Sequence, residues 1–203
     1  MIKLYHAPLT RSVRIYWLLE ELGIPYELET VAFQQPEAPF AQFTPFGKLP
    51  AIEDGEVRMF ESGAILEYVL ERYGEGRLAP APGTPARAEF LQWVHFAEAT
   101  AFPPLGNIAW HTIFRRDAER IPVAIADYRT WAEASLRMLE QALAGREYLV
   151  GGAFSGADVM MGYTLASAKW FGILTSERFP GVARYLARLE ARPAFQKALE
   201  RPT

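Results

Sequence analysis

The stretch LYHAPLTRSVRIYWLLEELGIPYE, residues 4–27, passes from a strand pattern into an amphipathic helix and on to a second strand pattern. Apolar residues predict the two strands at residues 2–5 and 26–31. Between them, leucine and isoleucine recur at helical spacing, and Gly23 stands where a helix favours a left-handed residue just past its end. The chain is therefore predicted to start as strand, helix, strand.

A hairpin and a second helix are predicted further along. Residues 49–60, LPAIEDGEVRMF, place Asp54 and Gly55 between two short apolar runs. An Asp-Gly pair readily adopts the positive φ values of a two-residue hairpin turn. Ser62 then precedes a helical pattern that ends at Gly74. The predicted order is βαβ, an irregular loop, and ββα.

The pattern changes at residues 74–85, GEGRLAPAPGTP, which are rich in glycine and proline and have no periodicity. Every long segment after them follows the helical period, and no strand pattern competes. We expect an α/β domain at residues 1–78, a linker at 79–85 and an all-helical domain at 86–203. Two separate cores predict a cleft between them.

The composition excludes several classes of protein. A net charge of -3, with scattered Lys and Arg, disfavours nucleic-acid binding. No apolar stretch approaches the roughly 20 residues of a membrane span, and the N-terminus lacks a signal-peptide pattern, so we expect a cytoplasmic location and no membrane partner. The histidines, His6, His95 and His111, lack metal-ligand spacing, so no metal is expected. Because cysteine is absent, sulfur chemistry must come from a ligand.

Four motifs occur in order along the chain: APLTRSVR at residues 7–14, TPFGKLP at 44–50, FES at 60–62 and FSGADV at 154–159. Together they resemble the cytosolic glutathione transferase family, in a bacterial-looking, serine- or threonine-type form, over nearly the whole chain. The resemblance implies a thioredoxin-like N-terminal domain that binds glutathione and an all-helical C-terminal domain that helps to hold an electrophile. It also implies a homodimer.

Glutathione chemistry needs a group that stabilises a thiolate. A thiol with a pKa of about 8.5 is only about 3% ionised at pH 7, and the thiolate is the nucleophile. A hydroxyl at a helix start can donate to the sulfur anion while the helix dipole adds attraction. In the serine-type members the catalytic serine lies two residues after a proline and four before an arginine, and Thr10 has this position.

The resemblance leaves three hydroxyls as candidates for this role. Thr10 is the first candidate, with Ser12 in reserve. Tyr5 aligns with the catalytic phenol of tyrosine-type members. The simpler interpretation is that Thr10 and Ser12 only cap a helix and that Tyr5 is a core aromatic residue.

Two of the motifs imply contacts with glutathione. TPFGKLP resembles the family's loop in which the residue before a cis-proline pairs with the backbone of the cysteinyl residue of glutathione. The resemblance therefore implies that Leu49 makes this pairing and that Pro50 is the cis-proline. It also implies that Lys48 binds the glycine carboxylate of glutathione. Glu61 and Ser62 would bind the ammonium and carboxylate of the γ-glutamyl end at a helix start. On residue type alone, Lys48 could be a surface charge and Ser62 an ordinary helix cap.

The helical half holds candidates for the electrophile pocket. Residues 100–114, TAFPPLGNIAWHTIF, interrupt the helical period with prolines and a glycine and surround the break with Phe102, Trp110, His111 and Phe114. These side chains would line an apolar pocket, although aromatic clusters also form ordinary cores. Asp158, three residues after Ser155, matches a capping box and is assigned to structure.

Three functions fit these residues. The first is a glutathione transferase that directs the thiolate at a small apolar electrophile. The second is a glutathione-dependent disulfide reductase or peroxidase of the same fold, and the third is a noncatalytic interaction module. The absence of cysteine disfavours enzymes that need a protein sulfur for a mixed disulfide.

Overall fold

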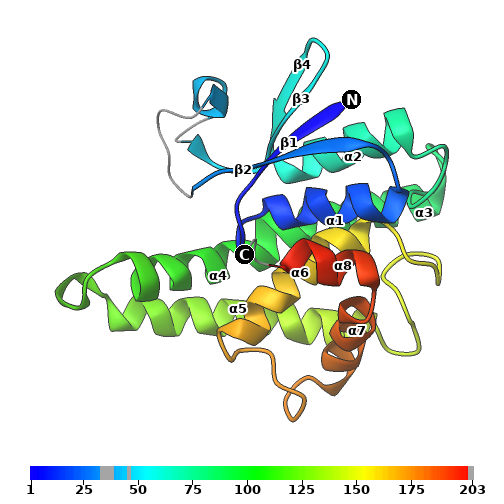
Figure 1. Ribbon diagram of the computed structural model, residues 1–203. Coiled ribbons are helices and arrows are strands. Elements are labelled where there is room, and N and C mark those ends of the chain that lie inside the picture. Colours follow the sequence, from blue (N-terminus) through cyan, green and yellow to red (C-terminus); the bar gives the residue numbers. More distant parts are fainter. Residues whose placement is uncertain (33–38, 45–46, 201–203) are drawn as a thin grey trace. The chain divides into compact units, whose positions relative to one another are not determined.

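The computed structural model (Figure 1) describes most of the chain, in the stretches 1–32, 39–44 and 47–200. Its contacts divide the chain into two compact units, Met1–Ala81 with the segment from Glu190 onward, and Pro82–Leu189. The predicted helical domain, 86–203, differs from the second unit because its last segment joins the first. A thioredoxin-like α/β unit and a helical unit confirm the expected fold class.

The first unit is built on a four-stranded mixed sheet. Its elements are β1 (Ile2–His6), α1 (Ser12–Leu22), β2 (Tyr26–Thr30), the 3-10 turn η1 (Pro39–Gln42), β3 (Ala51–Asp54), β4 (Val57–Phe60), α2 (Ser62–Tyr73) and α8 (Pro193–Leu199). The strand order is β2-β1-β3-β4, with β2 parallel to β1 and the β1–β3 and β3–β4 pairs antiparallel. This topology confirms the predicted βαβ and ββα halves.

Side chains of β1 alternate between the two faces of the sheet, and only those on one face pack against α1. His6 contacts Ser12 and Tyr16 of α1, so its face of the sheet is the helix-covered face. Tyr5, one residue earlier, points to the opposite face, because successive side chains of a strand alternate. There its ring packs in a buried cluster with Phe40 of η1.

Glycines with positive φ lie at the C-terminal end of α1 and in the turn of the hairpin. Gly23 has φ 65° and caps α1, as predicted. In the hairpin, Asp54 pairs with Val57, so the two central residues are Gly55 and Glu56 rather than Asp54 and Gly55. Gly55 has φ 62° at the first central position, which a hairpin turn of this length reserves for glycine.

The C-terminal helix α8 belongs to the first unit because it packs on α1, as Figure 1 shows with α8 in red beside α1 in blue. The rings of Trp17 and Phe195 stack with centroids 4.1 Å apart. Arg192 donates two hydrogen bonds to the Glu21 carboxylate, at 2.6 and 2.7 Å. A helical period cannot show which core a helix joins, so the sequence did not predict this return.

The second unit is helical. Its elements are α3 (Pro85–His95), the π-helical turn η3 (Phe96–Ala101), α4 (Phe102–Ala109), the π-helical turn η4 (Trp110–Phe114), the 3-10 turn η5 (Asp117–Glu119), α5 (Pro122–Ala142), α6 (Gly156–Trp170) and α7 (Pro180–Glu190), whose last residue is grouped with the first unit. Among the described residues of this unit, β structure is limited to an isolated bridge between Val150 and Ala153. No described helix is both long and apolar enough to cross a membrane.

The predicted break at residues 100–114 is wrong, since the chain there stays helical from α3 to η4. Pro103 and Pro104 lie in the first turn of α4, where a missing N–H costs little. The π-helical turn η3 just before them changes the hydrogen-bond register, which is how a helix commonly absorbs such a disturbance.

Asp158 holds the start of α6. Its carboxylate accepts from the Ser155 N–H and hydroxyl, the Leu149 N–H and the Tyr185 hydroxyl, at distances of 2.7 to 3.0 Å. Ser155 and Asp158 form the predicted capping box. The side chain is fully buried, and burial raises the pKa of Asp158 despite these four donors. Its place in the core agrees with the structural role expected for it.

Candidate functional site

Thr10 lies in the turn between β1 and α1 and is half-buried. Its hydroxyl donates to the Ala7 carbonyl at 2.8 Å and shares a 2.6 Å hydrogen bond with the Ser12 hydroxyl. Its oxygen also accepts from the Ser12 N–H at 3.3 Å, while the N-cap residue of α1 is Arg11, which makes no side-chain capping hydrogen bond. Leu9, just before it, is exposed and has φ 62°, a strained value for leucine. A half-buried hydroxyl beside a strained exposed residue can meet a ligand.

Ser12 is enclosed by contrast. It is the first residue of α1 and has no exposed surface. Its oxygen accepts from the Ala7 N–H at 3.2 Å and lies 2.8 Å from Nδ1 of His6. These contacts leave Ser12 behind Thr10 rather than beside it, and they rank Thr10 first for contact with a thiol.

Tyr5 does not join these hydroxyls. Its phenol donates to Glu53 on the face of the sheet opposite to α1. Burial, together with that hydrogen bond, raises the pKa of Tyr5 to about 12. A phenol that points away from Thr10 and resists ionisation is a core residue, as the simpler interpretation holds.

The start of α2 carries Glu61 and Ser62. Glu61 is exposed and has φ 73° and ψ 109°, values that few residues other than glycine adopt. Ser62 is buried, and its oxygen accepts a 3.0 Å hydrogen bond from Nη1 of Arg14. Because the first N–H groups of a helix lack intrahelical partners, this end of α2 can bind an anion.

Arg14 is the site residue that sequence reasoning missed. Its side chain has no exposed surface, and it joins the first turn of α1 to the first turn of α2. A buried guanidinium adds positive charge beside the α2 N-terminus, where an anion would bind. Arg14 lies three and four residues before Trp17 and Leu18, which places it on the apolar side of the helix. This spacing was the signal that could have predicted its burial.

The loop before β3 holds the other predicted residues. The Leu49–Pro50 peptide bond is cis, as the resemblance implies. Leu49 is buried in the same cluster as Ala7, whose carbonyl accepts from Thr10, so this loop lies next to the α1 turn. Lys48 is exposed. Residues 45–46 of the TPFGKLP motif lie outside the described residues.

The four aromatic candidates of the second unit separate into two pairs. Phe102 and His111 are each 8% exposed, and their rings stack on Tyr163 and Tyr128 respectively. Trp110 and Phe114 are each 47% exposed, with ring centroids 5.8 Å apart. Only the second pair offers an open apolar surface. Phe102 and His111 pack as core residues.

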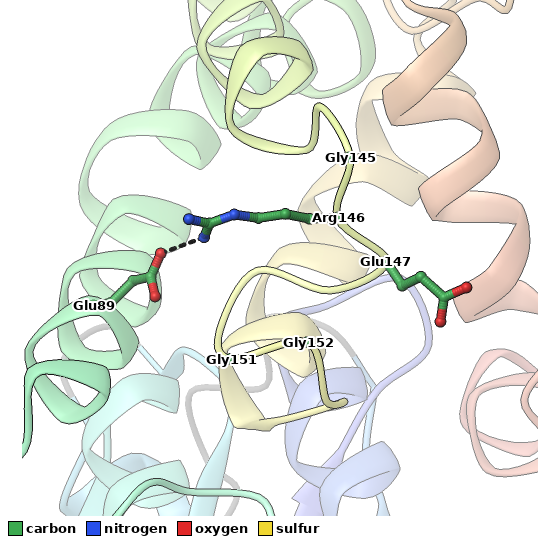
Figure 2. A pocket seen from close by; sticks show the side chains of 6 residues that line it. All are labelled: Glu89, Gly145, Arg146, Glu147, Gly151 and Gly152. Carbon is green, nitrogen blue, oxygen red and sulfur yellow. Dashed lines mark hydrogen bonds and ion pairs between the residues drawn. The ribbon is translucent and has the colours of Figure 1, made fainter.

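Figure 2 shows a cavity of about 390 Å³ in the helical unit. Its lining residues are Glu89, Gly145, Arg146, Glu147, Gly151 and Gly152. Arg146 reaches across it and pairs with Glu89 at 2.6 Å, which neutralises its charge. None of the predicted site residues lines this cavity, and we assign it no function.

Known proteins share both halves of the chain. The family descriptions "Glutathione S-transferase, N-terminal domain" and "Glutathione S-transferase, C-terminal domain" match residues 1–71 and 122–188. Glutathione S-transferase 3 of Schizosaccharomyces pombe is 28% identical, with 99% of this chain and 88% of the relative covered. Disulfide-bond oxidoreductase YfcG of Escherichia coli is 32% identical, with 98% and 94% covered.

Solved structures agree with these relatives. Glutathione transferase URE2P8 of Phanerochaete chrysosporium, with oxidized glutathione, superposes with a TM-score of 0.87 at 27% identity, over 97% of this chain and 92% of that one. Ure2p5 of the same organism, cocrystallized with 1-(S-glutathionyl)-2,4-dinitrobenzene, superposes with a TM-score of 0.83 at 26% identity. The match covers 98% of this chain and 92% of that one. The shared fold and the matches to both domains show that this chain belongs to the glutathione S-transferase family.

Proposed function

We propose that the protein is a glutathione transferase that stabilises glutathione as its thiolate and directs it at a small apolar electrophile. The observation that carries this proposal is the Thr10 hydroxyl, half-buried at the mouth of α1 and next to the loop of the cis Leu49–Pro50 bond. In this assignment Thr10 donates to the sulfur, and Ser12 supports it from behind.

The free energy that this assignment requires is modest. Lowering a thiol pKa by about two units corresponds to about 2.7 kcal/mol of preference for the anion. A hydrogen bond to a charged group contributes about 1.5–3 kcal/mol, and a helix N-terminus adds about 0.3–1 kcal/mol. One hydroxyl at a helix start is therefore sufficient.

The rest of glutathione has complementary groups in the first unit. We assign the γ-glutamyl carboxylate to Ser62 and the start of α2, where the buried Arg14 adds positive charge. The exposed Glu61 takes the ammonium, and the exposed Lys48 takes the glycine carboxylate. The backbone of Leu49 pairs with the cysteinyl residue.

The reaction itself is a nucleophilic substitution or addition. The thiolate donates an electron pair to an electrophilic carbon and a C–S bond forms. In a substitution the leaving group departs with the electrons of its bond to that carbon. In an addition or an epoxide opening, the π bond or the C–O bond breaks and the resulting anion takes a proton from water. We assign Trp110 and Phe114 to contact with the electrophile, because their rings are exposed and adjacent. We also propose that the chain acts as a homodimer.

A second candidate function is glutathione-dependent disulfide reduction. A relative that is 32% identical carries the name disulfide-bond oxidoreductase. Because this chain has no cysteine, such a reaction would pass its mixed disulfide through glutathione alone. The same Thr10 hydroxyl would serve it, since disulfide exchange also needs the thiolate.

A panel of glutathione-dependent assays separates these functions. We expect turnover of 1-chloro-2,4-dinitrobenzene or of an epoxide to exceed turnover of a small disulfide and of a hydroperoxide. Faster turnover of the disulfide would favour the second function. Glutathione binding without turnover of any substrate would indicate a noncatalytic module, and Thr10→Val is the variant that shows whether the activity arises at this site.

A further inference from the structure

Behind Thr10 lies a chain of short contacts that ends in the core. The Thr10 and Ser12 hydroxyl oxygens are 2.6 Å apart, and the Ser12 oxygen is 2.8 Å from Nδ1 of His6. His6 is 1% exposed, and its ring meets the edge of Tyr16 with centroids 5.3 Å apart. A buried histidine is thus connected through two hydroxyls to the position where we place the sulfur.

The direction of this chain depends on which nitrogen of His6 carries the proton. If the proton is on Nδ1, His6 donates to Ser12. The Ser12 proton then has two acceptors in reach, Thr10 at 2.6 Å and the Ala7 carbonyl at 3.2 Å, and its shorter bond to Thr10 leaves the Thr10 proton free to point at a ligand. If the His6 proton is on Nε2, Nδ1 accepts from Ser12, Ser12 accepts from Thr10, and Thr10 presents lone pairs to the ligand. Only the first arrangement suits a thiolate.

The burial of Nε2 distinguishes these two arrangements. Nε2 of His6 is buried, and no group among the described residues forms a hydrogen bond with it. A proton on Nε2 would create a buried N–H without an acceptor, whereas a bare nitrogen there is only an unused acceptor. Proteins tolerate a buried acceptor without a donor better than a buried N–H without an acceptor. The proton therefore belongs on Nδ1.

We propose that His6 is a positioning residue that, as the Nδ1–H tautomer, directs the Ser12 and Thr10 hydroxyls outward toward the glutathione sulfur. This inference rests on the proposed function of Thr10 and adds the group that sets its donor direction. Without glutathione the Thr10 proton goes to the Ala7 carbonyl at 2.8 Å, and with glutathione it turns to the sulfur. Burial lowers the pKa of His6 to about 4, so the ring is neutral at pH 7.

Nitrogen-15 NMR of the histidine side chains tests the tautomer in the protein without glutathione. We expect His6 to show a protonated Nδ1 and an unprotonated Nε2. The opposite pattern would overturn the proposal, whatever the enzyme's substrate is.

Substitutions then test the effect on the bound thiol, followed through its ultraviolet thiolate absorbance against pH. His6→Phe keeps an aromatic ring beside Tyr16 but removes the donor, and we expect about threefold less thiolate at pH 6.5, since bonds in a chain strengthen one another. His6→Asn places an amide N–H near the former Nδ1 and should restore most of the thiolate. The exposed His95, changed to Phe, is the matched control.

Different results would refute the role of His6 and the function proposed for the protein. The role of His6 would be refuted if the wild-type protein lowers the pKa of the bound thiol and the His6→Phe and His6→Asn variants lower it by the same amount. A wild-type protein that leaves the thiol pKa at about 8.5 would refute the proposed function. In that case the nitrogen-15 NMR spectrum of His6 still decides the direction of the hydrogen bonds from His6 through Ser12 to Thr10.

Discussion

Among single residues, Thr10 is the one that we propose as the donor to the glutathione sulfur, because its hydroxyl is half-buried and hydrogen-bonded to Ser12. Thr10→Val keeps the shape of the side chain and removes the donor. We expect the pKa of bound glutathione to rise toward about 8.5 and turnover at pH 6.5 to fall by about tenfold or more. Thiolate absorbance and steady-state kinetics measure both effects. Thr10→Ser, which keeps the hydroxyl, should retain most activity, and equal activity in Val and Ser variants would contradict the assignment.

Ser62 accepts a hydrogen bond from Arg14, and we propose that it also binds glutathione; the two effects can be measured separately. Ser62→Ala removes an oxygen that accepts from the buried Arg14, so we expect the free energy of unfolding to fall by about 1–3 kcal/mol. If Ser62 binds the γ-glutamyl carboxylate as we propose, glutathione affinity should also fall about tenfold in calorimetry. The exposed Ser176, changed to Ala, is the matched control. A glutathione affinity equal to the wild type would remove Ser62 from the binding site.

His6 makes stability depend on pH. Burial lowers the pKa of His6 from its ordinary 6.5 to about 4, so the folded state resists protonation that the unfolded chain accepts. Stability is therefore complete above pH 6.5 and is lost as the pH falls toward 4, by about 3 kcal/mol in total. Urea unfolding between pH 7 and 5 of the wild type and of His6→Asn isolates this effect as the difference between the two profiles, because other groups that titrate there, such as Asp158 with its raised pKa, are present in both proteins. We expect a less steep loss of stability in His6→Asn, and an equally steep one would exclude His6 as the cause.

The sequence predicted some of these residues and missed others for physical reasons. Thr10 and Ser62 belong to motifs with fixed spacing, so resemblance found them. Arg14 and His6 act through contacts that depend on burial, and no short motif encodes burial. Tyr5 was ambiguous because the face of a strand is known only once its neighbours are placed.

Among the elements, the start of α6 depends on a single buried carboxylate. Asp158→Ala would leave the Leu149 N–H, the Ser155 donors and the Tyr185 hydroxyl without their acceptor. We expect the free energy of unfolding to fall by about 3–5 kcal/mol, as for other buried charged partners. Tyr185→Phe, which removes one donor, should cost about 1–2 kcal/mol.

Urea titration measures these changes in stability. The control is Asp127→Ala on the exposed surface of α5, which should stay within about 0.5 kcal/mol of the wild type. A cost for Asp158→Ala as small as this control would show that solvent replaces the carboxylate and that the capping box is not required.

Local sequence signals located most of the elements, and their errors have local causes. The hairpin was predicted correctly, but its turn is one residue later, because pairing of Asp54 with Val57 fixes the register. Residues 100–114 remain helical because the prolines occupy a first turn, where they are tolerated. Of the four residues predicted for the electrophile pocket, Phe102 and His111 are buried and stack on rings of other helices, whereas Trp110 and Phe114 are exposed.

Across the whole molecule, the sequence predicted the order of strands and helices better than the grouping of its parts. The helical period correctly indicates a helix near the C-terminus but does not indicate what it packs against. The stacking of Phe195 on Trp17 and the Arg192–Glu21 ion pair assign α8 to the first unit. Such contacts join residues far apart in the chain, so they follow from the folded core rather than from local pattern.

The exposed side of α2 is the surface where we expect a second copy of the protein to bind. The family resemblance implies that this side packs on a second copy, so we expect a particle of twice 22.9 kDa in sedimentation at micromolar concentration. Ala64→Arg adds a long charged side chain to that exposed surface and should shift the protein toward the monomer. Ala144→Arg, at another exposed position, is the control. A wild-type protein found only at 22.9 kDa would exclude the dimer, and equal dimerisation of both variants would place the interface elsewhere.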